Sequence, residues 1–297
     1  MTRTDARPPA DPDAPPAGLR ASLVAAGTIT DDAVWLRLTG GRSNHSWRVI
    51  SADGVVVVKL TRPEAQTPLF PNDPDDEARA LTQLAGQTMA PRLCARLDTP
   101  DGPALIYGHV AGAHWHADPA PVGHLLGRLH NLPPPRGLRP RPGGRAALVA
   151  DTHRILELCP PGPQREDLCA ACPVTDDLPP CDDPRFLHGD PVPGNIIVTP
   201  DGPVLIDWQC PARGDPVEDL ALFLSPAMQL HDRGAVLSPA EAEAFLSAYP
   251  DPWAVARYRA LAPLYHWRMA AHCLWRGASG PDAAGLAAER AALDATR

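Results

Sequence analysis

Short apolar runs rich in β-branched residues alternate with turn residues in the first third of the chain, and this pattern predicts an antiparallel meander. The turn residues are Gly40-Gly41 and Asp53-Gly54, which are typical of tight hairpin connections. The strands expected from the pattern are 33–38, 46–51, 55–60, one near residue 95, and 103–107.

Helical periodicity dominates after Gly112. Before that point one helix is expected, with Asp73 as its N-cap and Pro74 in its first position. Farther on, Asp215 and Glu218 have the spacing of an N-cap and capping box. The helices expected beyond residue 112 are 121–132, 145–158, 216–230, 239–249, 252–276 and 282–296.

The order of these elements predicts an α+β fold with a small β-rich N-terminal lobe, which contains one helix, and a larger, mainly helical C-terminal lobe. We assign residues 20–110 to the first lobe and 111–297 to the second, and we expect a ligand cleft between them. Residues 1–19 are rich in Pro, Asp and Ala. They are expected to form a disordered tail, and neither a signal peptide nor a membrane span.

The composition narrows the classes of partner. A hydrophobic content of 44% is enough for a substantial core, and a net charge of −8 without a basic block argues against nucleic acid and anionic membranes. The same charge favours a cationic small molecule. No apolar run approaches the roughly 18 residues that cross a bilayer. The seven cysteines are therefore expected to be thiols of a cytoplasmic protein. The oligomeric state has no signature in the sequence.

Lys59 is the only lysine among the 27 lysine and arginine residues. It follows the valine run 55–58, so it is expected at the end of a buried strand. A planar guanidinium does not replace a compact ammonium, which indicates a specific role for this one lysine. Ligand phosphates and a helix-borne carboxylate are the usual partners of such a buried cation. The alternative is a lysine that has survived by chance on an edge strand.

Glu77 is the expected partner of Lys59. In the predicted helix it shares a face with Leu81 and Leu84, at spacings of four and seven residues, so the face that packs inward also carries an acid. An inward carboxylate is costly unless it is paired. A solvated helix start, where acids interact favourably with the helix dipole, is the structural alternative. The other candidate partners are Asp75 and Asp76.

The most informative motif is the spacing H-x-D-x-x-x-x-N formed by His188, Asp190 and Asn195, which is that of a kinase catalytic loop. In such a loop the aspartate accepts the proton of the acceptor hydroxyl and the asparagine holds a metal ion. Asp207 follows a predicted hairpin whose turn lies at 200–202. Asn195 and Asp207 supply oxygen ligands of the kind that Mg²⁺ prefers, so they are the candidate metal pair. Each residue alone would also suit a turn. His188 is expected to orient the loop.

The segment from His188 to Asn195, followed by Ile206-Asp207-Trp208, resembles the aminoglycoside phosphotransferase and choline kinase family, small-molecule kinases with a protein-kinase-like fold. The likeness covers the chain from about residue 20. It implies ATP as the donor, Mg²⁺ as the metal, Asp190 as the catalytic base, Lys59 on the nucleotide phosphates, and a hydroxyl of a small molecule as the acceptor. By the same analogy Asp219 is expected to brace the catalytic loop.

The segment between the first two predicted strands lies where a kinase covers the phosphates, although it departs from the pattern G-x-G-x-x-G. The residues alone fit a two-glycine hairpin equally well. The resemblance favours phosphate binding by backbone amides. The candidate nucleotide-binding residues of this segment are Gly40, Gly41, Arg42, Ser43 and Asn44.

The nature of the acceptor is open between two classes of alcohol. Tyr265, Trp267 and Trp275 lie on the long C-terminal helix where the family places acceptor-site residues, and aromatic faces attract cations. The same stripe is also typical of a helix core. Together with the net negative charge of the chain, a cation-binding role of this stripe favours choline, ethanolamine or a thiamine-like acceptor. The alternative is an aminoglycoside or a sugar-like alcohol. A catalytically inactive nucleotide-binding regulator would be a protein of a different class. The presence of every expected catalytic residue type argues against it.

A proline-rich segment gathers four of the seven cysteines around a single C-x-x-C pair. Four thiolates so close together are able to hold a structural zinc ion, and free thiols in a variable loop are the alternative. These residues are Cys159, Cys169, Cys172 and Cys181.

Overall fold

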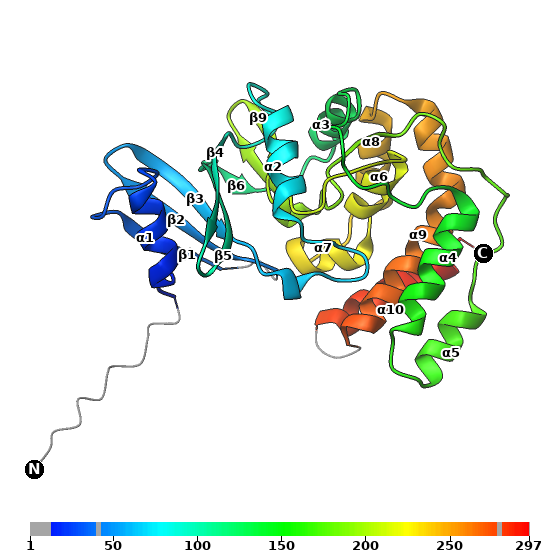
Figure 1. Ribbon diagram of the computed structural model, residues 1–297. Coiled ribbons are helices and arrows are strands. Elements are labelled where there is room, and N and C mark those ends of the chain that lie inside the picture. The colour runs from blue at the N-terminus through cyan, green and yellow to red at the C-terminus, as the bar shows by residue number, and fades with distance from the viewer. Residues whose placement is uncertain (1–12, 40–42, 278–280, 297) are drawn as a thin grey trace, which may run out of the picture. The chain divides into compact units, whose positions relative to one another are not determined.

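The computed structural model describes residues 13–39, 43–277 and 281–296, and the chain divides into two compact units (Figure 1). The first unit consists of Met1–Gln66 and Arg92–His109. The second consists of Thr67–Pro91 and Val110–Arg297. The expected α+β class is confirmed, since an antiparallel sheet dominates the first unit and helices dominate the second.

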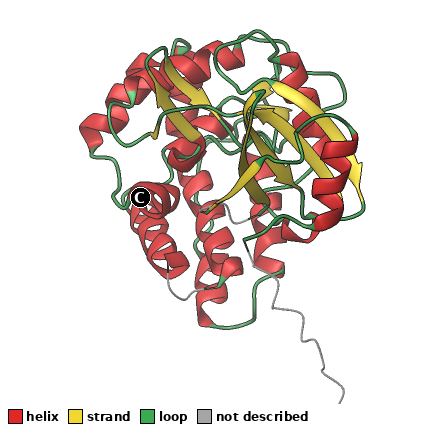
Figure 2. Cartoon of the chain, turned by 90° about the vertical axis from the view of Figure 1, so that its left-hand side faces the viewer, coloured by secondary structure: helices red, strands yellow, loops and turns green. Residues whose placement is uncertain are grey.

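Five antiparallel strands form the sheet of the first unit (Figure 2). Their order is β1-β2-β3-β5-β4. All five strands predicted from the apolar pattern are present, within two residues of the expected ends where these were given. The strands are β1 (Val34–Leu38), β2 (His45–Ser51), β3 (Gly54–Leu60), β4 (Leu93–Thr99) and β5 (Gly102–Gly108).

Helix α1 (Ala17–Ala25) contributes two fully buried leucines, Leu19 and Leu23, to the core of the first unit. They pack with Val58 and with its cross-strand neighbours Trp47 and Ile106, so these residues define the covered face of the sheet. Cross-strand neighbours share one face because side chains alternate along each strand. The sheet and its only described α-helix therefore form a two-layer core.

Helix α1 corrects the prediction of a disordered tail that extends to residue 19. The described chain is ordered from Asp13, whose carbonyl oxygen accepts a hydrogen bond of 2.8 Å from Trp47 Nε1. The helix was missed because its core contribution is a single pair of leucines four residues apart, which is too short a pattern to establish a period. Residues 1–12 lie outside the described part of the chain.

The opposite face of the sheet carries Lys59. It pairs with Ser46 on β2, which in turn pairs with Leu38 on β1, so these three residues point to the same side. Val57, two residues before Lys59, lies on this face as well. Lys59 is only 2% exposed, whereas Leu38 is 39% exposed. The cation is thus buried on a face that also presents apolar surface.

The second unit combines two small sheets with most of the helices. One sheet pairs β7 (Arg185–Leu187) with β10 (Ala212–Gly214), and the other has the order β6-β8-β9. Helices α4 (Gly144–Glu157) and α10 (Pro281–Asp294) each pack against the long helix α9 (Pro252–Arg276) (Figure 1). The remaining elements are α2 (Pro74–Gln83), β6 (Ala113–His114), α3 (Ala120–His130), α5 (Pro163–Ala170), β8 (Ile196–Thr199), β9 (Gly202–Leu205), α6 (Val217–Phe223), α7 (Pro226–Arg233) and α8 (Pro239–Ala248).

Helix α2 begins as predicted, because the Asp73 carboxylate accepts hydrogen bonds from the backbone N–H groups of Asp75 and Asp76 at 2.9 and 3.1 Å. It belongs to the second unit, whereas the lobe boundary predicted at residue 110 assigns it to the first. The reason lies in its contacts. Arg139 donates to Asp73 at 2.9 Å and to Asp76 at 3.1 Å, and Asp73 N donates to Gln209 O at 3.4 Å.

The single helix predicted over 216–230 is wrong, since the structure has two helices, α6 and α7, in its place. Ser225 separates them and caps α7 by accepting a hydrogen bond from Met228 N at 3.3 Å, with Pro226 in the first position. The predicted capping box at the start of α6 is also wrong. Glu218 is fully buried and pairs with Arg268.

Within the described ranges, no helix combines the length and the apolar character that crossing a bilayer requires.

Candidate active site

The candidate catalytic loop, residues 188–195 and called the catalytic loop below, is held between two strand pairs of the second unit. His188 follows β7 directly, and Asn195 closes a short 3₁₀ turn, Pro193–Asn195, that leads into β8. In the β8–β9 hairpin Ile196 lies opposite Leu205, and Ile206 N extends the ladder by donating to Asn195 O at 2.9 Å. Asp207 is the next residue. The hairpin therefore brings Asn195 and Asp207 to the same end, although they are twelve positions apart.

Asp190 and Asn195 are in direct contact. The Asn195 side-chain amide donates from Nδ2 to the Asp190 carbonyl oxygen at 2.9 Å and to Asp190 Oδ2 at 3.1 Å. With Nδ2 used in this way, Oδ1 is the side-chain atom that Asn195 has for a cation. Asp207 adopts a φ of +61°, in the left-handed region that aspartate enters more readily than most residues. The structure thus brings together the three residues that the H-x-D-x-x-x-x-N motif and the hairpin predicted.

His188 orients the loop, as expected. Its Nε2 lies 3.0 Å from the carbonyl oxygen of Ile206, which only accepts hydrogen bonds, so Nε2 carries the proton. Its Nδ1 accepts a hydrogen bond from Asp190 N at 3.2 Å. Both ring nitrogens of a neutral imidazole are therefore engaged by the backbone. The ring also packs edge-on against Trp208, with the centroids 4.4 Å apart.

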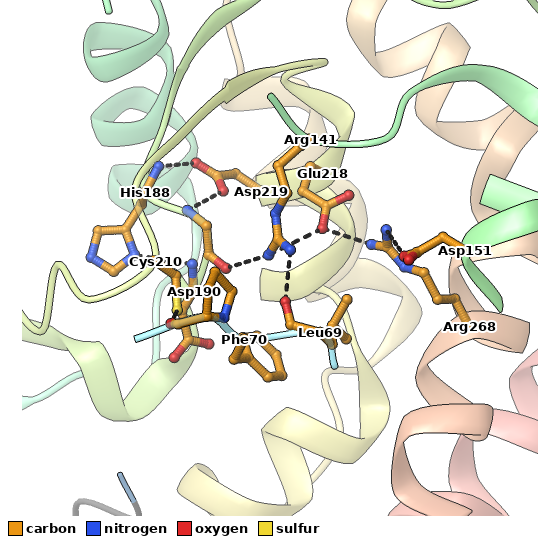
Figure 3. Close-up of polar contacts among 12 residues, drawn as sticks. Leu69, Phe70, Arg141, Asp151, His188, Asp190, Cys210, Glu218, Asp219 and Arg268 are labelled. Carbon is orange, nitrogen blue, oxygen red and sulfur yellow. Dashed lines mark hydrogen bonds and ion pairs between the residues drawn. The ribbon is translucent and has the colours of Figure 1, made fainter. Parts of the chain in front are cut away.

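Asp219 braces the start of the loop from the fully buried helix α6. Its carboxylate accepts hydrogen bonds from His188 N at 2.8 Å and from Gly189 N at 2.9 Å (Figure 3). His130 Nε2 lies 3.1 Å from the same group, and His130 Nδ1 lies 2.7 Å from the Tyr249 hydroxyl. Burial alone would raise the pKa of Asp219, but the hydrogen bond and charge of His130, with the backbone hydrogen bond from Gly189, act in the opposite direction, and the pKa is lowered.

Gly189 is required at its position. Its φ is +80°, and a Cβ atom there would collide with the carbonyl oxygen of Cys210. Only glycine meets both conditions. The backbone therefore passes next to Cys210 and delivers Asp190 into the site.

The electrostatics of Asp190 indicate a place for a cation. Burial raises the pKa of its carboxyl group well above the ordinary value, and the negative charges of Asp207 and Asp232 raise it further. Arg141 and Asn195 act in the opposite direction. The side-chain ligands available beside Asp190 are the carboxylate of Asp207 and the amide oxygen of Asn195, which suit a hard cation. The residues present thus fit Mg²⁺.

Asp232 was not predicted from the sequence. It lies on α7, and its Oδ2 accepts a hydrogen bond from Gly194 N at 3.1 Å, directly beside Asn195. Its other partner is His231. No local motif marks this residue, because its partner Gly194 is 38 positions away and is reached only through the packing of α7 against the 3₁₀ turn.

The predicted nucleotide residues are distributed over both units. Lys59 belongs to the first unit and Glu77 to the second, and they are 2% and 1% exposed. Charged groups are buried to this degree only with partners. Their mutual pairing stays a prediction. Ser43 and Asn44 immediately precede β2, and Asn44 Oδ1 accepts a hydrogen bond from Arg62 N at 3.0 Å. Gly40, Gly41 and Arg42 lie outside the described residues.

The aromatic residues of α9 are mostly core residues. Trp267 is fully buried and donates from Nε1 to Leu168 O at 2.7 Å, and Tyr265 is 5% exposed beneath the guanidinium of Arg268. Trp275 is half-buried and stacks on His272. Burial therefore favours the core alternative for Tyr265 and Trp267.

Trp267→Phe tests this assignment. The variant loses the hydrogen bond to Leu168 O but retains an aromatic ring in the core, so we expect the free energy of unfolding to fall by about 1–3 kcal/mol. KM for the acceptor should stay within about twofold of the wild-type value. Chemical denaturation and steady-state kinetics give the two numbers. A large rise in acceptor KM without loss of stability would instead place Trp267 at the acceptor.

The cysteine-rich segment shows no metal centre. Among the described residues, which include all seven cysteines, no group of three or more His, Cys, Asp or Glu side chains is arranged to hold a metal ion. Cys159 is buried and Cys169 is exposed. The free-thiol alternative is the one that the structure supports.

Residues 34–295 match the family model described as the phosphotransferase enzyme family, which covers most of the chain. The chain belongs to the phosphotransferase enzyme family. The expectation of an enzyme is thus confirmed: the protein is a phosphotransferase that acts on a hydroxyl acceptor. No curated protein matches its sequence.

Solved structures with the same fold include both classes named by the resemblance. A choline/ethanolamine kinase family protein from Mesorhizobium loti is 18% identical, with 94% of this chain and 93% of that chain covered and a TM-score of 0.65. An ethanolamine kinase from Plasmodium vivax is 12% identical, with 94% and 90% covered and a TM-score of 0.63. Spectinomycin phosphotransferase, solved with ADP and spectinomycin, is 12% identical, with 92% of each chain covered and a TM-score of 0.59. The protein-kinase-like fold is thereby confirmed.

Proposed function

We propose that this phosphotransferase moves the γ-phosphoryl group of ATP to a hydroxyl of a small cationic molecule such as choline, ethanolamine or a thiamine-like alcohol. The observation that carries the proposal is the contact of Asp190 with Asn195, whose backbone pairs with the residue before Asp207. In this arrangement Asp190 would act as a general base beside two oxygen ligands for a metal. Phosphoryl transfer needs little more than such positioning and charge neutralisation.

Asp190 would accept the proton of the acceptor hydroxyl, because its raised pKa makes the carboxylate a better base than an exposed aspartate. Asn195 and Asp207 would hold Mg²⁺. When bound, Mg²⁺ neutralises charge on the nucleotide phosphates. His188 and Asp219 keep the loop fixed during the transfer, since each is engaged with backbone groups of the loop.

Lys59, braced by Glu77, would bind the nucleotide phosphates. The face of the sheet that carries Lys59 supports a nucleotide site, because Leu36, Leu38 and Val57 lie on it and offer apolar surface for a base. The turn that precedes β2 would cover the phosphates with backbone amides. The residues proposed for that turn are Gly40, Gly41, Arg42, Ser43 and Asn44.

The preference for a cationic acceptor rests on charge. Asp207 and Asp232 both act on Asp190, and the chain has a net charge of −8. A cation entering this site would relieve the repulsion among the three carboxylates. Two of the structures with this fold are a choline/ethanolamine kinase family protein and an ethanolamine kinase, which adds support. The four thiols of the cysteine-rich segment are free, in keeping with a cytoplasmic location.

An aminoglycoside is the second candidate acceptor. Spectinomycin phosphotransferase has the same fold. Aminoglycosides are also cationic alcohols, so the carboxylates near Asp190 would suit them as well. The two candidate acceptors differ in size, so an assay that offers both small and large cationic alcohols distinguishes them.

Acceptor-dependent release of ADP from ATP tests the proposal. The panel holds choline, ethanolamine, thiamine and an aminoglycoside, each with and without Mg²⁺. We expect one of the first three to raise ADP release about tenfold or more over the rate without acceptor, and chelation of Mg²⁺ to abolish the increase. Activity with the aminoglycoside alone would favour the second candidate. If no acceptor in the panel raises ADP release although ATP binds, both proposed acceptor classes are wrong.

A further inference from the structure

Arg141 is a buried arginine beside the catalytic loop to which the mechanism above gives no role. Its side chain is 8% exposed. Nη1 donates to the carbonyl oxygen of Leu69 at 2.6 Å, and Nη2 donates to the carbonyl oxygen of Gly189 at 3.3 Å (Figure 3). One guanidinium therefore joins the segment before α2 to the residue before Asp190.

The backbone of Arg141 is fixed to the sheet that carries the catalytic loop. Arg141 N donates to Arg213 O, and Arg213 N donates to Arg139 O, both at 3.0 Å. Arg213 lies on β10, where its neighbour Ala212 pairs with Leu187 on β7. Leu187 is the residue before His188. The base of the Arg141 side chain thus cannot shift without disturbing the start of the loop.

The peptide group between Gly189 and Asp190 is held at both of its polar atoms. Its carbonyl oxygen accepts from Arg141, and its N–H, which belongs to Asp190, donates to His188 Nδ1 at 3.2 Å. Because a peptide group is planar, its orientation sets the direction in which the Asp190 side chain leaves the backbone. Arg141 and His188 together determine that orientation.

Buried charges on neighbouring helices hold the guanidinium of Arg141 in place. Glu218 Oε1 lies 3.6 Å from Arg141 Nη2 and 2.6 Å from Arg268 Nη2, and Arg268 Nη1 lies 3.6 Å from Asp151 Oδ2 (Figure 3). Glu218 and Arg268 are 0% and 2% exposed. The four side chains form a row in which positive and negative charges alternate, so each buried charge lies next to a group of opposite charge. Their order is Arg141, Glu218, Arg268 and Asp151.

We propose that Arg141 is a positioning residue for phosphoryl transfer, which fixes the Gly189–Asp190 peptide so that the Asp190 carboxylate is directed at the acceptor hydroxyl. This inference rests on the proposed role of Asp190. An arginine is needed because its planar fork donates to two carbonyl oxygens in different directions while it faces Glu218. A lysine ammonium carries the same charge but does not span the same acceptors.

Arg141→Lys tests the proposal, with Arg154→Lys as the matched control. Arg154 also holds the segment before α2, through a bond of 2.9 Å from Nη2 to Pro68 O. Its other side-chain partner is Asp151, at 2.7 Å, and within the described residues none of these bonds reaches the catalytic loop. We expect Arg141→Lys to lower kcat by about 10- to 100-fold while KM for ATP changes by less than about twofold. Arg154→Lys should leave both within about twofold. Thermal unfolding checks that both variants are folded.

The outcomes separate this inference from the proposed function, which the acceptor panel tests with the wild-type enzyme. Asp190→Ala is assayed alongside: if it keeps acceptor-dependent turnover, the proposed role of Asp190 as the base is wrong, and the positioning role of Arg141 with it. If Asp190 is required but a folded Arg141→Lys has the wild-type kcat, only the positioning role is wrong. An equal fall in kcat for Arg154→Lys would also overturn that role, because the effect would then not depend on the bond to Gly189 O. Should the lysine variant not fold, Arg141→Gln, which buries no charge, is expected to show the same selective loss of kcat.

Discussion

Asp190→Asn is expected to lower kcat by about 1,000-fold and to leave the Kd for Mg-ATP within about threefold. Asparagine keeps the shape of the side chain and an oxygen for the hydrogen bond from Asn195 Nδ2, but it does not accept a proton from the acceptor hydroxyl. General base catalysis by a positioned side chain contributes roughly 10²–10⁴-fold, and the loss should fall in that range. Steady-state kinetics and nucleotide titration measure the two quantities.

The same variant should unfold at an equal or higher temperature than the wild type at neutral pH. The pKa of Asp190 is raised by burial and by its carboxylate neighbours, so the ionised group opposes folding above its ordinary pKa, and removing the charge removes that opposition. Asp201→Asn is the matched control, because Asp201 lies exposed in the turn between β8 and β9. Both variants should be folded, and only Asp190→Asn should lose turnover. Retention of turnover in Asp190→Asn would contradict the proposed base.

Asp219→Ala is expected to lower the free energy of unfolding by about 3–6 kcal/mol and to abolish measurable turnover. The substitution leaves three buried donors without an acceptor, namely the backbone N–H groups of His188 and Gly189 and the Nε2 of His130. Each stranded donor costs about 1–3 kcal/mol. The catalytic loop would lose the group that fixes its first two residues.

Denaturant unfolding of Asp219→Ala and wild type measures this loss, and Asp251→Ala serves as a graded control. Asp251 caps α9 by accepting from the backbone N–H groups of Trp253 and Ala254, so its removal should cost only about 0.5–2 kcal/mol and leave kcat unchanged. Because the pKa of Asp219 is lowered in the folded protein, its stabilisation is complete above the unfolded value of about 3.9 and is lost as the pH falls through the folded value. The difference between Asp219→Ala and wild type should shrink in the same acid range. A difference that persists unchanged there would contradict the assignment.

Features that depend on neighbouring residues in the sequence were predicted well. The sheet of the first unit follows from β-branched runs and the turn residues between them, and the start of α2 follows from the cap at Asp73. The catalytic loop was recognised because the spacing of His188, Asp190 and Asn195 reflects a single short turn and one strand. In each case the signal and the structure lie within a dozen residues.

Features that depend on distant packing were not predicted. Glu218 has the spacing of a capping box, but Arg268, 50 positions away, determines its role. Asp232 reaches Gly194 only through the packing of α7, and Arg141 meets Gly189 only because β10 pairs with β7. The sequence leaves the role of Trp267 undecided between substrate binding and core packing. A periodic stripe of aromatic residues does not indicate what covers that side of the helix.

In the β8–β9 hairpin, strand pairing sets how close Asn195 and Asp207 lie to each other. The number of residues in the turn between the two strands does not affect this distance. Both residues sit at the open end, while Pro200 and Asp201 form the exposed tip at the other end. Insertions are tolerated best at such exposed tips, whereas a slip of one residue in pairing would turn every side chain of a strand to the other side. The tip is therefore a natural attachment point for a fluorophore or an affinity tag, one that reports on the enzyme without touching the carboxylates at the far end.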